Sequence, residues 1–227
     1  MFYMYYWWIM IPAIVLAMYA QSKVKSNYVK YSKIKNGRGL TGLQVAESIL
    51  RSHQIYDVKI ERGSGQLTDH YNPKTKTVVL SPHVYDGDSI SSASIAAHEC
   101  GHVIQHSEAY GPLSFRSMLA GPTQLASKAS PFLIMGGFIF FSSMAWLIDL
   151  GIVAYLIITL FHLVTLPVEF NASSRAIHAM SEGQLVYDED IDGTKKVLNA
   201  AALTYVAAML SALLTTIRLI MLRDRRN

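Results

Sequence analysis

Cysteine is almost absent from this chain of 227 residues, and charge is scarce. The single cysteine, Cys100, excludes an intrachain disulfide and a cysteine-based zinc cluster. Only 16% of the residues are charged, whereas 51% are hydrophobic. The basic balance, with a pI near 9.1, comes mainly from lysines between residues 23 and 35 that follow an apolar run. Because they belong to no nucleic-acid motif, we expect attraction to anionic lipid headgroups and no nucleic-acid partner.

The first apolar block, residues 2 to 20, contains no charged residue. As a helix it would be about 28 Å long, close to the thickness of the bilayer core. It lacks the preceding positive charge and the small-residue cleavage site of a signal peptide, so we predict a retained membrane helix. Aromatic residues at one membrane interface fit this prediction, and a buried core helix is the alternative. These aromatic residues are Tyr3, Tyr5, Tyr6, Trp7 and Trp8.

Two further apolar blocks predict more membrane spans. Residues 131–167 would form a helix of roughly 55 Å, too long for one crossing. We predict two short spans that turn at "IDLG", which places Asp149 and Gly151 at the membrane surface. Residues 200–222 are rich in small side chains that permit close helix packing, and they predict a fourth span.

The predicted fold class is an α-rich (α+β) polytopic membrane protein with about four transmembrane helices and a small zincin-like domain of helices and a short sheet. Five segments follow from this prediction: an amino-terminal span at 1–22, a catalytic domain at 23–130, a transmembrane hairpin at 131–168, a helix and acidic loop at 169–198, and a last span with a basic tail at 199–227.

The distribution of positive charge predicts the orientation. Thirteen of the twenty Lys and Arg residues lie between the first span and the hairpin, and three more lie between the hairpin and the last span. Positive connections favour the cytoplasm, so we expect a cytoplasmic catalytic site. The tail residues Arg223, Arg225 and Arg226 would then be outside, against the rule, but the five lysines directly after the first span outweigh them.

The catalytic segment shows a helix, a short sheet and a second helix. Thr41 and Gln44 are spaced as a capping box, and "YDVKIE" alternates as a strand does. "LTDHY" and "KTVVLS" predict a hairpin, after which Asp88 or Ser89 would cap the next helix. An exposed strand edge could bind a peptide substrate, either "LTDHY" or the strand Thr77, Val78, Val79 and Leu80. The alternative is a hairpin that only supports the helix.

The motif "AAHECGHVIQH" contains H-E-x-x-H. On a helix His98 and His102 differ by about 40° in azimuth and about 6 Å in rise, so both imidazoles can bind one ion. Glu99 points about 100° away, where it could take a proton from water. This pattern predicts a zinc peptidase helix with Glu99 as general base. Cys100 faces away from the histidines and is expected to be a packing residue.

A catalytic zinc needs a third protein ligand. His106 lies about 12 Å along the helix from His98, too far unless the helix breaks. The longer motif H-E-x-x-H-x-x-G-x-x-H fails at Gln105 and Glu108. The best candidate is Glu169 in "LPVEFNASSRA", because a hairpin at 131–167 would return it to the side of His98. The alternative is an interfacial Glu169 paired with Arg175.

The segments "GQLTDHYNPKTKTVVLSPHVY", "AAHECGHVIQH", "LPVEFNASSRA" and "VLNAAALTYVAAML" resemble the YugP-type membrane zinc metallopeptidases of bacteria. More distantly, the arrangement is similar to the HtpX-like and CAAX prenyl endopeptidase groups of membrane gluzincins. This resemblance implies one Zn²⁺ on His98, His102 and Glu169, with Glu99 as base and later proton donor. It covers residues 40 to 215 approximately.

The chain departs from the family pattern at two positions. Ser173 stands where distant relatives have aspartate, and Asn171 stands where close relatives tend to have aspartate. Asn171, Ser173 and Arg175 are therefore candidates for supporting the ligands. Arg175, His70 and Tyr71 are candidates for stabilising an oxyanion, and the sequence does not choose among them.

These features together predict a multi-pass zinc endopeptidase of the bacterial plasma membrane that cleaves membrane or membrane-proximal proteins, with membrane proteins as candidate partners. The alternative is a catalytically silent zinc-binding scaffold or chaperone partner that keeps the fold without turnover. A metal transporter is disfavoured because the predicted spans contain few polar residues. Asp192 is expected to cap the helix that leads into the last span.

Overall fold

The protein is described by a computed structural model in which residues 6–224 are placed. Tyr3, Tyr5, Arg225 and Arg226, which enter the predictions on interface and orientation, lie outside the described residues. The chain divides into two compact units. Unit 1 comprises residues 1–20, 114–167 and 203–227, and unit 2 comprises residues 21–113 and 168–202. The chain leaves unit 2 after Leu113 and returns to it at Val168.

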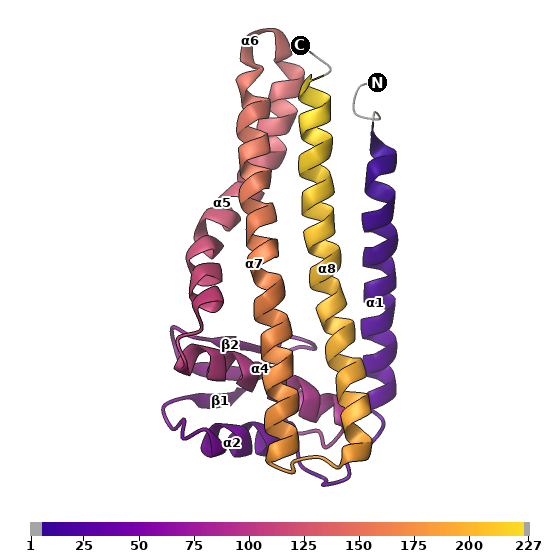
Figure 1. Cartoon of the computed structure of the whole chain (residues 1–227), viewed down its shortest axis with the longest axis vertical. Coiled ribbons are helices and arrows are strands. Elements are labelled where there is room, and N and C mark those ends of the chain that lie inside the picture. Colours follow the sequence, from indigo (N-terminus) through magenta and orange to yellow (C-terminus); the bar gives the residue numbers. More distant parts are fainter. Residues whose placement is uncertain (1–5, 225–227) are drawn as a thin grey trace. The chain divides into compact units, whose positions relative to one another are not determined.

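Helices dominate both units, and Figure 1 shows their order along the chain. The described elements are η2 (Trp7–Met10), α1 (Ile11–Tyr31), α2 (Gly42–Ser52), β1 (Lys59–Arg62), β2 (His70–Asn72), β3 (Thr77–Leu80), α3 (Pro82–Tyr85), α4 (Ile90–Ser107), α5 (Gly111–Ile139), α6 (Phe141–Met144), α7 (Trp146–Glu182) and α8 (Asp188–Asp224).

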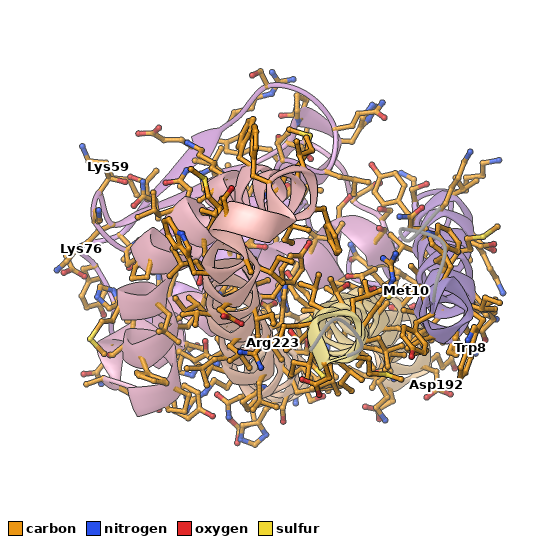
Figure 2. The ribbon with its side chains drawn as sticks, turned by 90° about the horizontal axis from the view of Figure 1, so that it is seen from above. Trp8, Met10, Lys59, Lys76, Asp192 and Arg223 are labelled. Carbon is orange, nitrogen blue, oxygen red and sulfur yellow. The ribbon has the colours of Figure 1, made fainter. Side chains whose placement is uncertain are left out.

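Unit 2 contains a three-stranded sheet in the order β1-β3-β2. The predicted hairpin is confirmed, since β2 and β3 pair antiparallel with Tyr71 opposite Val78. β1 pairs with β3 in parallel, and its first residue donates a backbone hydrogen bond to the Lys76 carbonyl at 2.9 Å. Figure 2 shows Lys59 and Lys76 close together at this side of the sheet.

The sheet order corrects one prediction about substrate binding. The strand Thr77–Leu80 was a candidate exposed edge, but it lies in the centre of the sheet, with a partner on each side. Its backbone groups are therefore used within the sheet. The sequence "KTVVLS" has the apolar character of a central strand. One edge of this strand pairs with β2, and the other pairs with β1, which precedes the hairpin in the chain. Of the two candidates, only β2, from "LTDHY", is an edge strand.

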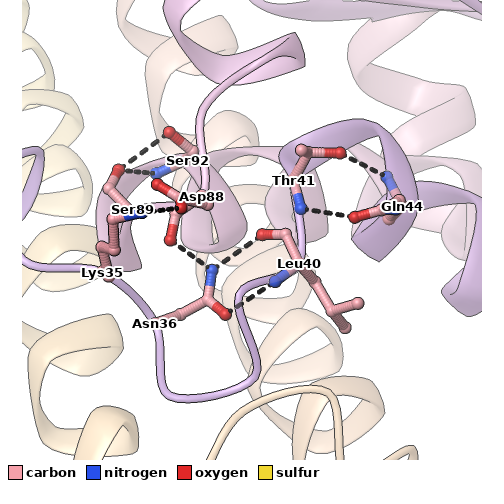
Figure 3. Close-up of polar contacts among 8 residues, drawn as sticks. All are labelled: Lys35, Asn36, Leu40, Thr41, Gln44, Asp88, Ser89 and Ser92. Carbon is pink, nitrogen blue, oxygen red and sulfur yellow. Dashed lines mark hydrogen bonds and ion pairs between the residues drawn. The ribbon is translucent and has the colours of Figure 1, made fainter.

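Side-chain caps define the amino-terminal ends of α2 and α4, the two helices that pack near this sheet (Figure 3). The predicted capping box is confirmed, because the Thr41 hydroxyl accepts from the Gln44 backbone N–H and the Gln44 side chain accepts from the Thr41 N–H. Ser89 caps α4 by accepting from the Ser92 N–H at 3.0 Å, which decides between the two predicted caps. Asn36, 2% exposed, donates to the Asp88 carbonyl and so ties the preceding loop to the start of α4.

The core of unit 2 lies between α2, the sheet, α4 and the second part of α7. α2 contributes Val45, Ala46, Ile49 and Leu50, and the sheet contributes Val78 and Leu80. Alanines dominate the face of α4, and Ala176 and Ala179 come from α7. Small side chains let helix axes approach closely, so α4 and α7 pack directly against each other.

Unit 1 contains the hairpin formed by α5 and α7, which are joined through α6 in Figure 1. The chain turns at residues 140–145, not at "IDLG". Gly151 lies within α7, where an added Cβ would meet Ile134 of α5 at 2.7 Å. Asp149 is in the first turn of α7 and pairs with Arg223 at 2.9 Å. This ion pair removes the need for a turn at the acidic residue.

Three helices among the described residues are long and apolar enough to cross a membrane, so the prediction of four spans is wrong. They are Trp7–Tyr31, Trp146–Glu182 and Asp188–Asp224. Of the predicted spans, the one in α5 does not meet these criteria of length and apolar character, because its continuous apolar part runs only from Pro131 to Ile139 before the turn.

The last helix begins earlier than predicted. α8 starts at Asp188, so Asp192 lies inside the helix and does not cap it. Asp188, Glu189 and Asp190 occupy the first turn, where acidic side chains interact favourably with the helix dipole. A run of three acidic residues therefore begins the helix where the sequence pattern indicated a loop.

Candidate metal site

Three predicted ligands lie together in unit 2. His98 and His102 come from α4 and Glu169 comes from α7, and one ligand atom of each lies within 4.8 Å of the others. The Glu169 carboxylate oxygen Oε2 lies 3.2 Å from His98 Nε2 and 3.6 Å from His102 Nε2. The two imidazole rings meet edge to face, with their centroids 4.9 Å apart. The donor atoms therefore converge on one point.

The cluster is well shielded from solvent. The Glu169 side chain is 2% exposed, and the side chains of His98 and His102 are 14% and 11% exposed. Burial of a carboxylate is costly without a compensating positive charge or hydrogen bond. Here two imidazoles contact the same carboxylate oxygen, so the three side chains compensate one another.

The close packing of α4 and α7 brings these side chains together. Gly101 lies one position before His102, and a Cβ there would be 2.3 Å from the Ala172 carbonyl oxygen on α7. Ala97 and Ala176 are completely buried on the same two helices. Because α7 is continuous from Trp146 to Glu182, Glu169 is held on a rigid helix that packs at van der Waals distance from α4.

The other ring nitrogen of each histidine also has a partner. His102 Nδ1 lies 3.0 Å from Gln105 Oε1, and His98 Nδ1 lies 3.2 Å from Ser173 Oγ. Such contacts fix the ring orientation and leave Nε2 directed at the cluster, as is usual for histidines that bind metals. The contact between Ser173 Oγ and His98 Nδ1 thus agrees with a supporting role for Ser173.

Spacing tests whether the cluster fits a zinc ion. Ligand atoms at about 2.05 Å from a tetrahedral ion are about 3.3 Å apart. The two nitrogen–oxygen distances of 3.2 and 3.6 Å lie on either side of this value. Two imidazoles and one carboxylate are also the donor set of several catalytic zinc sites, which leave the fourth position to water or substrate. The residues present therefore fit zinc.

Glu99 and Cys100 lie between the two histidines on α4. Glu99 is 8% exposed, and Cys100 is completely buried with its sulfur 3.8 Å from the Ala46 carbonyl oxygen. Burial raises the pKa of the Cys100 thiol, and this side chain packs in the core of unit 2, as predicted. Burial alone would lower the pKa of His102, but the nearby carboxylates of Glu169 and Glu99 raise it above its ordinary value.

The remaining predicted residues have partners of their own. Arg175 Nε donates to Asn171 Oδ1 at 2.7 Å, and its Nη1 pairs with Glu108 at 2.6 Å. Both Asn171 and Arg175 thus belong to one polar chain on α7 that reaches the end of α4.

Two oxyanion candidates lie on the edge strand β2. Tyr71 places its hydroxyl 2.7 Å from His106 Nδ1, and His70 Nδ1 lies 2.8 Å from the Thr68 carbonyl oxygen. His106 is exposed at the end of α4 and is not a member of the metal-ligand cluster, as helix rise predicts. The pair of Tyr71 and His106 therefore joins β2 to α4.

Sequence reasoning missed Gln105. Its side chain is completely buried, and it contacts His102, the Val168 carbonyl oxygen and Asn171. In the sequence, Gln105 stands out only as a mismatch to the longer zinc motif H-E-x-x-H-x-x-G-x-x-H. The available signal was its spacing, three residues after His102 on one helix face, which places two side chains in contact.

A buried cluster of two histidines and a glutamate, built on H-E-x-x-H and a second helix, could hold a metal ion, and this donor set suits zinc. The chain belongs to the family described as putative neutral zinc metallopeptidase, whose model matches residues 6–224. It is also 45% identical over 212 residues to the putative membrane protease YugP of Bacillus subtilis (strain 168), with 93% of each chain covered. No solved structure matches the chain. The predicted family resemblance is confirmed.

Proposed function

We propose that this protein is a membrane-embedded zinc endopeptidase that hydrolyses peptide bonds of membrane or membrane-proximal proteins. The observation that carries the proposal is the buried convergence of His98, His102 and Glu169. Membership of a zinc metallopeptidase family and three apolar helices of sufficient length support it. The relative in Bacillus subtilis carries the name of a membrane protease, which agrees with this class of reaction.

Each residue of the site has a distinct role in this proposal. His98, His102 and Glu169 hold one Zn²⁺, which when bound supplies Lewis acidity toward a carbonyl group and toward water. Glu99 accepts a proton from the attacking water and delivers it to the leaving amine. Ser173 and Gln105 hold the two imidazole rings in place through their Nδ1 atoms. Hydrolysis of an amide consumes one water, and the same carboxyl group moves the proton in both steps.

The substrate would bind as an added strand along β2. This strand is an edge of the sheet, and its Tyr71 side chain contacts His106 on the metal-site helix. An extended peptide can pair with the free backbone groups at such an edge. This pairing fixes the direction of the peptide independently of its side chains. The structure of the sheet thus favours a protein or peptide segment in extended form as the substrate.

The membrane location is part of the same proposal. We place the chain in the bacterial plasma membrane with the metal site on the cytoplasmic side, because most of the Lys and Arg residues lie in the connections that would face it. Membrane proteins are the proposed partners and substrates. Labelling of cysteines introduced one at a time at Lys33 and at Ser143, in a Cys100→Ala background, with an impermeant reagent tests this orientation. Labelling at residue 33 from outside intact cells would contradict it.

The decisive experiment compares metal content and proteolysis of the purified wild-type protein with two variants. Glu99→Gln should retain zinc and lose activity, whereas Glu169→Ala should lose most of the zinc. Glu182→Ala is a matched control, since Glu182 is an exposed acidic residue of the same helix α7. Full activity in Glu99→Gln would overturn the mechanism. Zinc binding without proteolysis in the wild type would favour the alternative, a silent scaffold or chaperone partner.

A further inference from the structure

Gln105 occupies the centre of a chain of hydrogen bonds between the two helices that carry the ligands. Its Nε2 lies 2.8 Å from the Val168 carbonyl oxygen and 3.0 Å from Asn171 Oδ1, and its Oε1 lies 3.0 Å from His102 Nδ1. The side chain is completely buried, so each of these contacts replaces a bond to water. The orientation of this amide therefore has a large energetic effect.

The partners allow only one orientation of the Gln105 amide. The Val168 carbonyl oxygen can only accept a hydrogen bond, so the NH₂ group must face it. Asn171 Oδ1 must also accept, because its other neighbour is the Arg175 guanidinium, which has no acceptor atom. A flipped Gln105 would place its oxygen against both of these acceptors. The Gln105 oxygen is thus directed at His102 Nδ1.

This polarity determines which nitrogen of His102 carries the proton. Since Gln105 Oε1 can only accept, His102 Nδ1 must donate, and a neutral imidazole then has its lone pair on Nε2. Nε2 is the nitrogen that faces Glu169 in the cluster. We propose that Gln105 is a positioning residue. Its amide donates a hydrogen bond to the backbone carbonyl oxygen of Val168, one residue before Glu169, and thereby fixes His102 in its metal-binding tautomer.

His98 offers an internal comparison. Its Nδ1 lies 3.2 Å from Ser173 Oγ, and a hydroxyl group can donate as well as accept. Ser173 orients the ring but does not dictate its tautomer. The two histidines of one motif are therefore controlled in different ways. Both contacts depend on the packing of α4 against α7, directly through Ser173 for His98 and through the Val168 carbonyl oxygen and Gln105 for His102.

The proposal has a consequence for zinc affinity. Without an acceptor at Nδ1, His102 can carry its proton on Nε2 and donate to Glu169, which hides the lone pair that zinc needs. Loss of a supporting contact of this kind typically lowers metal affinity by about 10- to 100-fold. We expect Gln105→Met, which has a similar shape but no hydrogen-bonding amide, to fall in this range. Ser173→Ala should have a smaller effect.

The test measures zinc affinity by competition with a chelator, in the full-length protein in detergent. Gln66→Met is the matched control, because Gln66 is exposed in the loop before β2. A change of less than about threefold in Gln105→Met, well below the usual effect of a supporting contact, would overturn the proposal. Equal losses in Gln105→Met and Ser173→Ala would also contradict it.

A second measurement avoids dependence on a variant that folds poorly. Nitrogen-15 NMR of the zinc-loaded wild type with labelled histidine reports directly which ring nitrogen of His102 carries the proton and which one binds the ion. The His102 signal is assigned by its loss in His102→Gln. We expect the proton on Nδ1, and a proton on Nε2 would overturn the proposal.

This inference rests on the proposed zinc site but does not depend on hydrolysis. If the wild type binds zinc tightly and cleaves no peptide, the proposed endopeptidase activity fails while the affinity and tautomer measurements still decide the role of Gln105. If His102 has the expected tautomer and Gln105→Met binds zinc as well as the wild type, the role of Gln105 fails while the zinc peptidase proposal stands.

Discussion

Gly101 on α4 packs against the backbone of Ala172 on α7 so closely that a single added carbon atom would not fit. An ideal Cβ at Gly101 would lie 2.3 Å from the Ala172 carbonyl oxygen. Because the obstacle is main chain, no side-chain rotation can relieve it. Gly101 is next to His102, and Ala172 is three residues from Glu169. This backbone contact therefore limits the distance between α4 and α7 at the candidate metal site.

We expect Gly101→Ala to separate α4 from α7 and to weaken zinc binding. Overpacking of this kind typically costs about 1–3 kcal/mol of unfolding free energy, more than the roughly 1 kcal/mol that alanine gains in a helix. Thermal unfolding in detergent and zinc affinity measure the two effects. Gly121→Ala is the control, since nothing lies within 4 Å of a Cβ at Gly121 in α5. Equal behaviour of the two variants would contradict this prediction.

Tyr71→Phe tests whether the edge strand supplies an oxyanion donor. The Tyr71 hydroxyl is already bound to His106 Nδ1 at 2.7 Å, so we expect kcat of the zinc-loaded enzyme to fall by less than about tenfold. Removal of a true oxyanion donor costs roughly a hundredfold or more. His106→Gln removes the Tyr71–His106 contact but keeps the Tyr71 hydroxyl, so comparing the two variants separates loss of this contact from loss of an oxyanion donor. A loss above a hundredfold in Tyr71→Phe alone would assign it to catalysis.

Thr41→Ala removes the capping box that begins α2. The Thr41 hydroxyl accepts from the Gln44 N–H, and loss of such a cap typically costs about 1 kcal/mol. We expect a lower Tm with little change in zinc affinity, because α2 contributes no ligand. Ser48→Ala on the same helix is the control. Its hydroxyl donates within the helix to the Gln44 carbonyl oxygen, so the change should be neutral or slightly stabilising.

Removal of zinc should destabilise the wild type but not a variant that lacks the third ligand. A metal that binds only the folded state adds about 2.7 kcal/mol when its free concentration is one hundred times Kd. We therefore expect a chelator to lower the Tm of the wild type and to leave that of Glu169→Ala unchanged. A chelator-sensitive Tm in Glu169→Ala would show that other residues hold the ion.

Local patterns in the sequence were sufficient for much of unit 2. The capping box at Thr41, the Ser89 cap and the hairpin at Asn72 follow from contacts within a few residues, and the structure contains all three. Helix rise alone kept His106 out of the metal-ligand cluster. Such features are predictable because the atoms that decide them are close together in the chain.

Features that depend on distant partners were predicted less well. The strand Thr77–Leu80 became central only because β1 pairs with it, and its own sequence does not reveal this second partner. The predicted hairpin turn at "IDLG" is wrong because it assumes that Asp149 must lie at the membrane surface, whereas Arg223 on another helix pairs with it. Gln105 was overlooked for the same reason, since Val168 lies 63 residues away.

The sequence by itself determined which side chains the candidate site contains. His98, Glu99 and His102 lie on one helix, and with a rise of 1.5 Å per residue their spacing lets both histidines face the same ion. It also narrowed the third ligand to Glu169 through the return of the chain after a long apolar segment. Only the tertiary structure decided how tightly the two helices approach, which nitrogen of His102 is left for the metal and which strand forms the edge. These properties come from contacts between α4, α7 and the sheet, whose energies depend on side chains that no local pattern brings together.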